Sequence, residues 1–285
     1  MVGGEAMEKV VITNKNGESI TLGNQAPFYL QVIDGVGNIP VTIESQKAPK
    51  QDGSTYLGNM LEGRAISIEG MIITRSNPDE VLECRRKMQK VLNPKLGLVT
   101  ISYQNKEIKG IVETTPIFPS GQGNKGIYYQ KYLIQIICHN PFWLDSFTES
   151  REMSYLMGGI RFNLRLPTNF SNRGFRRKCI NDGDVDTPII VEFKGPAINP
   201  TVNNLSTGEF IRLNRELGEN DVLNISTEFG KKYVKVNGEN AFHFIDLDSV
   251  FWSLVQGENI LSYESNNDSI KTRVIVKWKN RYLGV

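Results

Sequence analysis

The sequence has few cysteines and no long apolar run. Its three cysteines, Cys84, Cys138 and Cys179, are odd in number and far apart, which excludes a disulfide framework and a CxxC metal pair. We expect them to be small buried or partly buried side chains. No segment approaches the roughly 18 to 20 apolar residues that span a bilayer. The start, MVGGEAMEKVV, lacks a charged region followed by an apolar stretch, so we expect synthesis in the cytoplasm without a signal peptide.

The sequence also lacks a large excess of positive or negative charge. The chain has 33 Lys and Arg against 31 Asp and Glu, and a net charge of +2 is too small to indicate nucleic acid or a membrane as a specific partner. With 285 residues, of which 39% are hydrophobic and 22% charged, the composition is that of a soluble globular protein with about two domains.

Catalytic motifs are scarce. There are only two histidines, His139 and His243, and there is no GxSxG or HExxH motif. We expect His139 in a turn and His243 on a strand, both in structural roles. The GxGxxG pattern in residues 120–126 leads into IYYQKYLIQIIC, which alternates like a strand, whereas a dinucleotide fingerprint requires a helix there. We therefore interpret it as a hairpin loop.

The carboxylate clusters do not complete a metal or catalytic pattern. Asp182, Asp184 and Asp186 have the spacing of a Ca²⁺ loop, but the glycine at position 6 and the glutamate at position 12 are absent. A turn that leads into a strand is the simpler interpretation. Asp246 and Asp248 could act as a glycosidase pair, yet nothing in the sequence sets their separation, and ends of solvated loops are favoured. We expect no enzyme activity, no metal and no cofactor.

Strand patterns dominate both halves of the chain. Segments such as RAISIEGMII and YYQKYLIQII alternate or are rich in β-branched and aromatic residues, with turn residues between them. One helix is predicted over 78–92, where Asn77 can cap, Pro78 fits the first turn, and an apolar stripe recurs at helical spacing. Pro94 then ends the helix.

The pattern changes after residue 145, which predicts two domains. Residues 1–145 form the first domain, with the helix, and residues 146–285 form the second. Strands in the second half recur every 8 to 12 residues or so, which is typical of a β-sandwich or jelly roll. Before them, the segment FSNRGFRRK has a loop-like composition. Its basic residues Arg173, Arg176 and Arg177 are candidates for a subunit contact or a polyanion site, with subunit contact or solvation favoured.

Several ordered blocks of the sequence resemble one known family. These are YLGNMLEGRAISIEGMI, ICHNPFW, GDVDTPIIVEFKGPAINPTVNNLSTGEFIRLN, LNISTEFGKKYVKVNGEN, DSVFWSLVQGEN and KWKNRYLGV. Their order and spacing are similar to those of the distal tail proteins of siphophages that infect Gram-positive hosts. The resemblance extends over nearly the whole chain.

The resemblance implies a fold and a role. It implies an N-terminal split β-barrel with one α-helix and a C-terminal galectin-like β-sandwich. Such proteins form a hexameric ring at the virion tail tip or baseplate, where the ring joins the tail tube protein to the tail-tip proteins. The implied partners are therefore other copies of the chain and these tail proteins. DNA would only pass through the channel, and no membrane contact is implied.

The alternative function is a carbohydrate-binding module that contributes to adsorption to the host cell surface. A saccharide site would use an aromatic side chain together with polar groups, and Trp252 and His243 are the candidates. Alternation places Phe251 and Trp252 on opposite faces, so we expect one of them to pack between the sheets of the sandwich. The segment Lys47 to Asn59, rich in Gly, Gln and Ser, is a candidate loop that orders on assembly and meets the tail tube.

Overall fold

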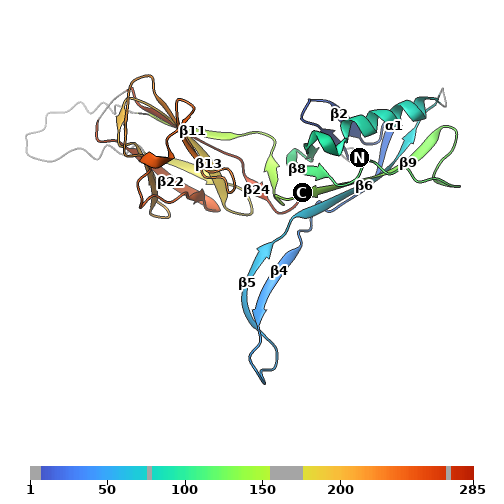
Figure 1. Ribbon diagram of the computed structural model, residues 1–285, viewed down its shortest axis with the longest axis horizontal. Coiled ribbons are helices and arrows are strands. Elements are labelled where there is room, and N and C mark those ends of the chain that lie inside the picture. The colour runs from blue at the N-terminus through green and yellow to red at the C-terminus, as the bar shows by residue number, and fades with distance from the viewer. Residues whose placement is uncertain (1–7, 76–78, 155–175, 268–270) are drawn as a thin grey trace, which may run out of the picture. The chain divides into compact units, whose positions relative to one another are not determined.

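The computed structural model describes residues 8–75, 79–154, 176–267 and 271–285, and the chain folds into two compact units (Figure 1). The first unit comprises Met1–Ser146 together with Tyr282–Val285, and the second comprises Phe147–Arg281. The chain therefore passes between the units twice, because its C-terminal residues return to the first unit. The predicted mainly β fold with a helix in the first half is confirmed.

The first unit is built around one sheet whose strands follow the order β2-β1-β7-β8-β9-β6-β3. The strands are β1 (Val10–Thr13), β2 (Ser19–Leu22), β3 (Phe28–Asp34), β6 (Arg64–Ile73), β7 (Leu98–Tyr103), β8 (Lys106–Val112) and β9 (Tyr129–Cys138), with β10 (Trp143–Asp145) and β24 (Arg281–Tyr282) attached off this path. Alternation buries one face of each strand. In β9, every second residue from Gln130 to Cys138 is buried.

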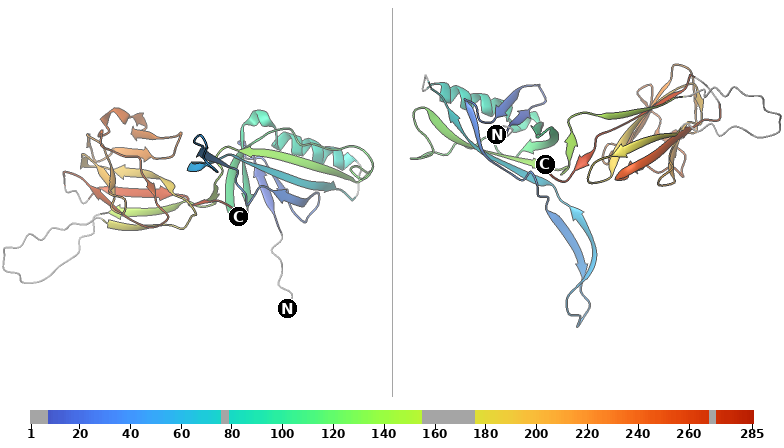
Figure 2. Two further views of the ribbon diagram at one scale, coloured as in Figure 1. Left: turned by 90° about the horizontal axis from the view of Figure 1, so that it is seen from below. Right: turned by 180° about the vertical axis from the view of Figure 1, so that it is seen from behind.

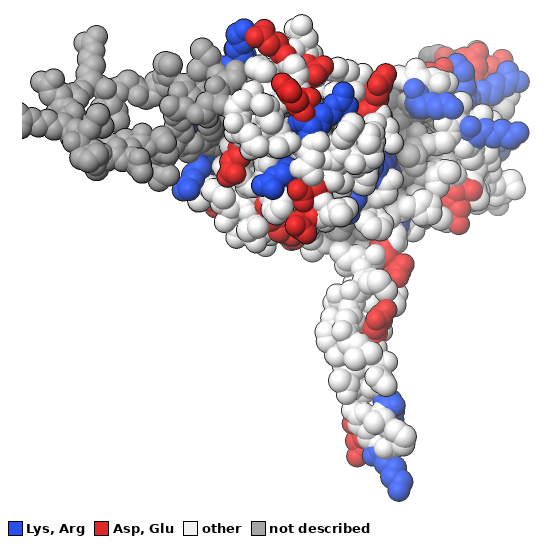
Figure 3. Space-filling model, turned by 60° about the vertical axis from the view of Figure 1, so that its left-hand side comes forward, with Lys and Arg blue, Asp and Glu red and all other residues white. Residues whose placement is uncertain are grey.

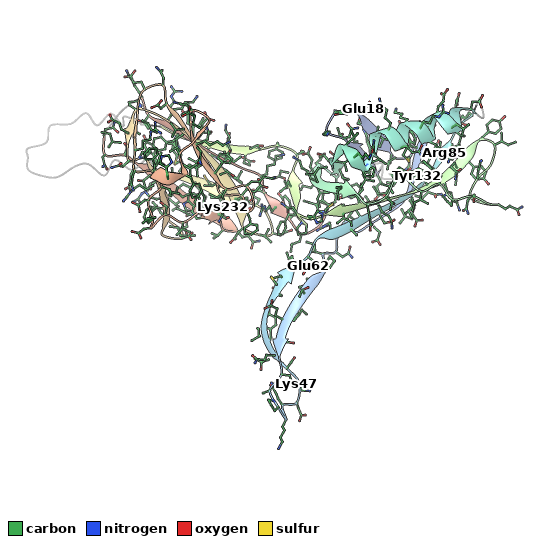
Figure 4. All side chains as sticks on the ribbon, in the orientation of Figure 1. Glu18, Lys47, Glu62, Arg85, Tyr132 and Lys232 are labelled. Carbon is green, nitrogen blue, oxygen red and sulfur yellow. The ribbon has the colours of Figure 1, made fainter. Side chains whose placement is uncertain are left out.

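The two edge strands of this sheet meet at one point, which makes it a split barrel. Gly23, which follows β2, donates its N–H to Phe28 O at 3.1 Å and accepts from the N–H of Leu30 at 2.9 Å. Within the described residues no further pairing joins β2 to β3, so the barrel stays open beyond Leu30. The hydroxyl of Tyr132 on β9 donates to Tyr29 O on β3 at 2.9 Å (Figure 4).

Gly70 of β6 makes room for this tyrosine. A Cβ atom at position 70 would lie 2.3 Å from the Tyr132 hydroxyl oxygen and 2.2 Å from the carbonyl oxygen of Tyr29. These separations are far below van der Waals contact. A glycine is therefore required where one side chain crosses from β9 over β6 to β3.

The predicted helix is present as α1 (Asp79–Val91) and is followed by a 3₁₀ turn, Pro94–Leu96. The predicted apolar stripe consists of Val81, Cys84, Met88 and Val91. All but Cys84 are buried, and Cys84 is partly buried against the core. The helix thus lies on the sheet with its apolar side inward (Figure 2). Asn77 and Pro78, which were expected to begin the helix, lie outside the described residues.

The second unit is a β-sandwich. One sheet has the order β11-β23-β13-β18-β19-β20 with β21 beside β13, the other has the order β12-β22-β15-β16, and β14 pairs with β17. The strands are β11 (Glu149–Ser154), β12 (Arg176–Asn181), β13 (Thr187–Lys194), β14 (Ala197–Ile198), β15 (Thr201–Asn204), β16 (Glu209–Arg212), β17 (Glu216–Leu217), β18 (Val222–Ser226), β19 (Tyr233–Val236), β20 (Glu239–Asn240), β21 (Ser253–Leu254), β22 (Gly257–Glu264) and β23 (Arg273–Trp278). Side chains from both sheets form one apolar core.

Of the adjacent aromatics Phe251 and Trp252, one is buried between the sheets, as predicted. Trp252 is 2% exposed and belongs to the core of the sandwich. Phe251 is partly buried, and its ring stacks on that of Phe242 with centroids 5.6 Å apart. The Nζ atom of Lys232 lies 5.4 Å from the Phe251 ring (Figure 4). Of the two aromatics, only Phe251 is therefore partly accessible to solvent.

Two local predictions in this unit are wrong. His243 lies in a 3₁₀ helix, Phe242–Phe244, and not on a strand. Arg176 and Arg177 lie on β12 and not in a loop, because β12 pairs with β22 over its whole length. That pairing is made with residues about 80 positions later in the chain. Such a partner gives no signal in the local sequence.

Replacing Trp252 by alanine should lower the free energy of unfolding by about 3 to 5 kcal/mol, because it leaves a large cavity between the sheets. The control is Phe229→Ala, since Phe229 is 90% exposed in the same unit, and its effect should stay within about 0.5 kcal/mol. Urea denaturation measures both. Equal stability of the Trp252→Ala variant and the native chain would contradict the placement of Trp252.

The cysteines should differ in their reaction with a thiol reagent. Cys138 and Cys179 are 0% exposed, and burial raises the pKa of Cys138 to about 12 and that of Cys179 to about 11. Cys84 is only partly buried. We expect one thiol per chain to react in the native protein and three after denaturation. Peptide mapping of the native adduct should identify Cys84, and label on either of the other two would contradict this.

Candidate assembly interface

A β-hairpin projects from the sheet of the first unit (Figure 1). It consists of β4 (Val41–Gln46) and β5 (Thr55–Leu61), which pair with each other and with no other described strand. All residues of both strands are exposed except the partly buried Gly58. Figure 4 shows Glu62 at the base of this hairpin and Lys47 near its tip. We call residues 41–61 the arm.

The arm carries large apolar side chains that have no core to enter. Their exposed fractions are Val41 45%, Ile43 67%, Tyr56 60%, Leu57 60%, Met60 56% and Leu61 40%. Val41 lies opposite Leu61, and Ile43 follows two residues later, so these three share one face. A lone two-stranded hairpin is at best marginally stable in water. An exposed apolar hairpin is therefore typical of a surface that another protein covers.

The base of the arm is held by a buried arginine. Arg64, the first residue of β6, is 0% exposed, and its guanidinium donates to the carbonyl oxygens of Gly35 at 3.2 Å and of Val36 at 2.6 Å. It also donates to the carbonyl oxygen of Leu283. The indole N–H of Trp143 donates to the same Val36 carbonyl at 3.0 Å. Desolvation lowers the pKa of Arg64.

Gly35 is needed at this point for two reasons. Its φ is +83°, in the left-handed region that favours glycine, and a Cβ atom there would lie 2.0 Å from the carbonyl oxygen of Ala65. Its N–H donates to the Asp34 carboxylate at 2.8 Å. The chain can therefore turn sharply out of β3 on its way to the arm.

The returning C-terminal segment has a second attachment to the first unit. Lys106 Nζ lies 2.6 Å from Asp145 Oδ1, and the Asp145 side chain is 3% exposed. The same ammonium lies 3.5 Å from the centre of the Tyr282 ring. Hydrogen bonding to Asp145 and Tyr282 outweighs desolvation, so the pKa of Lys106 is raised although desolvation is the largest single influence. Residues 282–285 are thus an integral part of the split barrel.

The residues that sequence reasoning assigned to a saccharide or subunit contact do not come together as one site. Trp252 is buried in the core, so neither face of its ring is available to a sugar. His243 is exposed, and its ring lies 4.0 Å from that of Phe244. Arg176 and Arg177 are exposed on β12, where Arg177 Nε donates to Glu152 O at 3.1 Å. Arg173 lies outside the described residues.

The segment Lys47 to Asn59 was expected to be a loop, and this is only partly right. Residues 47–54 form the tip of the arm, but Thr55 to Asn59 belong to β5. Sequence reasoning assigned residues 47–59 a contact with the tail tube, but it did not identify the apolar strands of the arm as an interface, although Val41 and Ile43 alternate with polar residues. That alternation marks a strand, but it does not reveal that the apolar side lacks a core.

The described part of the chain contains no candidate metal centre. No group of three or more His, Cys, Asp or Glu side chains there is placed to hold a metal ion. A broad depression of about 1100 Å³ borders β1 and β7, where the Tyr103 hydroxyl donates to Glu8 and accepts from the Gln104 side chain. None of the described helices is long and apolar enough to cross a membrane.

Two family models match the sequence. One, described as a phage tail protein RIFT-related domain, matches residues 15–138. The other, described as the C-terminal domain of a siphovirus-type tail component, matches residues 182–282. Together they cover most of both units. No curated protein matches the sequence.

Solved structures with the same fold include phage tail proteins. The Dit (gp 19.1) protein of SPP1, described as a hub of the adsorption apparatus in phages that infect Gram-positive bacteria, matches with a TM-score of 0.70 at 10% identity, over 96% of this chain and 99% of that one. A chain of the phage P2 baseplate in its activated conformation with Ca matches with a TM-score of 0.56 at 12% identity, over 99% and 100%. At these identities, the likeness shows a common fold.

Replacing Arg64 by alanine should lower the free energy of unfolding by at least about 3 kcal/mol, because it removes a buried donor from the carbonyl groups of Gly35, Val36 and Leu283. The matched control is Arg86→Ala, since Arg86 is exposed on α1 and should change stability by less than about 0.5 kcal/mol. Urea denaturation of both variants measures the difference. Similar losses in the two variants would contradict the structural role of Arg64.

Proposed function

The chain belongs to the siphophage distal tail protein family, and from this premise we propose that it forms a hexameric ring joining the tail tube to the tail tip or baseplate. The chain is a structural component of a phage tail. The single observation that best supports assembly is the arm, whose apolar side chains are exposed on a hairpin that no described element covers. Contact with another chain would bury them.

The first unit is the part that builds the ring. Obligate oligomers bury more than about 2,000 Å² per interface, and the arm together with the edge strands of the barrel can contribute to such an area. A ring arises when the same contact is repeated between different surfaces of successive copies and the rotation closes. The channel through the ring is lined by polar side chains, so that DNA passes without binding.

The second unit serves the tail-tip side of the assembly. Its core is closed within the sandwich, so it does not need other chains to fold. Arg176 and Arg177 stand exposed on β12 and are candidates for contact with an acidic neighbouring protein. The protein acts mechanically, without catalysis and without a cofactor, as the fold-related tail proteins suggest.

Carbohydrate binding is the less favoured function. The aromatic residue proposed for a saccharide platform, Trp252, is inside the core, and His243 packs against Phe244. These positions support a structural role for both residues. Titration of the protein with cell-wall saccharides should therefore give no signal, and a signal that disappears in the His243→Ala variant would restore this alternative.

Purified protein at high concentration should form particles with six times the mass of one chain in light scattering, with six-fold rings in electron micrographs. Replacing residues 41–61 by a short Gly-Ser turn should give monomers, because the exposed apolar strands are removed. A control with Lys47→Ala and Lys50→Ala changes only the tip and should retain the rings. Rings that survive loss of the arm, or particles with another symmetry, would contradict the proposal.

A further inference from the structure

The arm and most of a second apolar surface lie at opposite ends of one strand pair. β6 and β9 pair over their full length, from Arg64 opposite Cys138 to Ile73 opposite Tyr129. Strands of ten residues span about 30 Å. The arm ends at Leu61, close to the first end of this ladder, while the loop that precedes β9 lies at the other end (Figure 1).

That second surface consists of Ile117, Ile127 and Tyr128, which we call the loop patch. Their exposed fractions are 42%, 69% and 46%. All three lie on the segment that runs along β9 and leads into it. Ile127 and Tyr128 directly precede β9, at the end of the ladder far from the arm, whereas Ile117 lies beside Leu133, near the middle of the ladder. The backbone beneath them is held by hydrogen bonds between Ile117 and Leu133 at 2.9 and 3.0 Å, and by Thr74 N–H to Tyr128 O at 2.9 Å. The backbone of the loop patch is therefore fixed by hydrogen bonds to the rest of the sheet.

The interior side of this segment is anchored to the rest of the unit. Phe118, next to Ile117, packs against the core, and the guanidinium of Arg85 on α1 lies 4.6 Å from its ring centre (Figure 4). The side chains of the loop patch are exposed although Phe118, on the same segment, packs against the core. They are therefore exposed in the folded unit and not because the segment has failed to pack.

The charges around the two surfaces are complementary. Figure 3 shows the stem of the arm covered mainly by uncharged side chains, with acidic groups along it. Glu44 and Glu62 belong to this stem and its base, whereas Lys125 and Lys131 flank the loop patch. In the described ranges none of these four side chains forms an ion pair. Contact between the two surfaces would bring opposite charges together.

We propose that the arm of one copy docks on the loop patch of the next copy. The occupant is a second copy of this chain, because apolar area and charge on the arm match those on the loop patch. A hairpin with strands of six and seven residues reaches about 20 Å, which is too short to return along the ladder to Ile127 and Tyr128 of its own chain. Because the arm and the loop patch are different surfaces, the contact repeats head to tail and can close into a ring. This inference rests on the proposed ring function and assigns its interface.

Two complementary variants test the docking. Ile43→Asp places a charge on the apolar face of the arm, and Ile127→Asp places one on the loop patch; both positions are exposed, so the fold is retained. Each variant alone should be monomeric in light scattering. An equimolar mixture should form dimers and nothing larger, because only one intact arm and one intact loop patch can meet. A mixture that stays monomeric would overturn the proposed pairing.

The outcomes separate this inference from the ring proposal. If the native chain forms six-fold rings and Ile127→Asp forms them as well, the ring stands and the loop patch is not its interface. If the native chain forms no ring on its own or on tails, the proposed function fails first.

Cross-linking tests the contact even when it is short-lived. In a Cys84→Ser background, a chain with Ile43→Cys and Ile127→Cys should form disulfide-linked multimers about tenfold faster than a control with Ile43→Cys and Leu98→Cys. Leu98 is 55% exposed elsewhere on the same sheet. Multimers larger than dimers are expected under mild oxidation. Equal rates for the two chains would overturn the proposal.

Discussion

The buried guanidinium of Arg64 is the constraint on which the first unit depends. A charge removed from water must find other polar partners, and Arg64 finds carbonyl oxygens of Gly35, Val36 and Leu283. Those carbonyls come from two segments more than 200 positions apart in the chain. The segment with Gly35 and Val36 leads from β3 to the arm, and the segment with Leu283 is the C-terminus that returns to the first unit. A single side chain thereby fixes both to the start of β6.

This anchoring explains how the unit can expose an apolar hairpin and remain folded. The core of the split barrel, closed by α1 and by the contact of Gly23 with β3, stabilises the unit without help from the arm. The arm then contributes little to the stability of the single chain, and its apolar strands stay exposed until another surface covers them. Burial of these apolar strands therefore stabilises the assembly and not the single chain.

Much of the fold could be predicted from the sequence. The strands of both units alternate clearly, the helical stripe that includes Met88 packs on the sheet, and one aromatic of the pair at 251 and 252 enters the core. The two failures have different causes. Arg176 and Arg177 look like a loop because they are charged, but pairing with β22 extends them. His243 alternates with aromatics like a strand residue, but it lies in a 3₁₀ turn whose first residue, Phe242, donates its N–H to the side chain of Asn240.

The sequence by itself determined the class of the protein, because apolar periodicity decides which segments become strands and which becomes a helix, and because ordered blocks resemble one family. Only the tertiary structure decided which apolar residues lack a core. Val41 and Ile43 have the same pattern as buried residues of β6, and the difference is that their strands pair with nothing but each other. Whether a strand has neighbours depends on contacts between distant segments. The candidate interface is therefore a property of the fold.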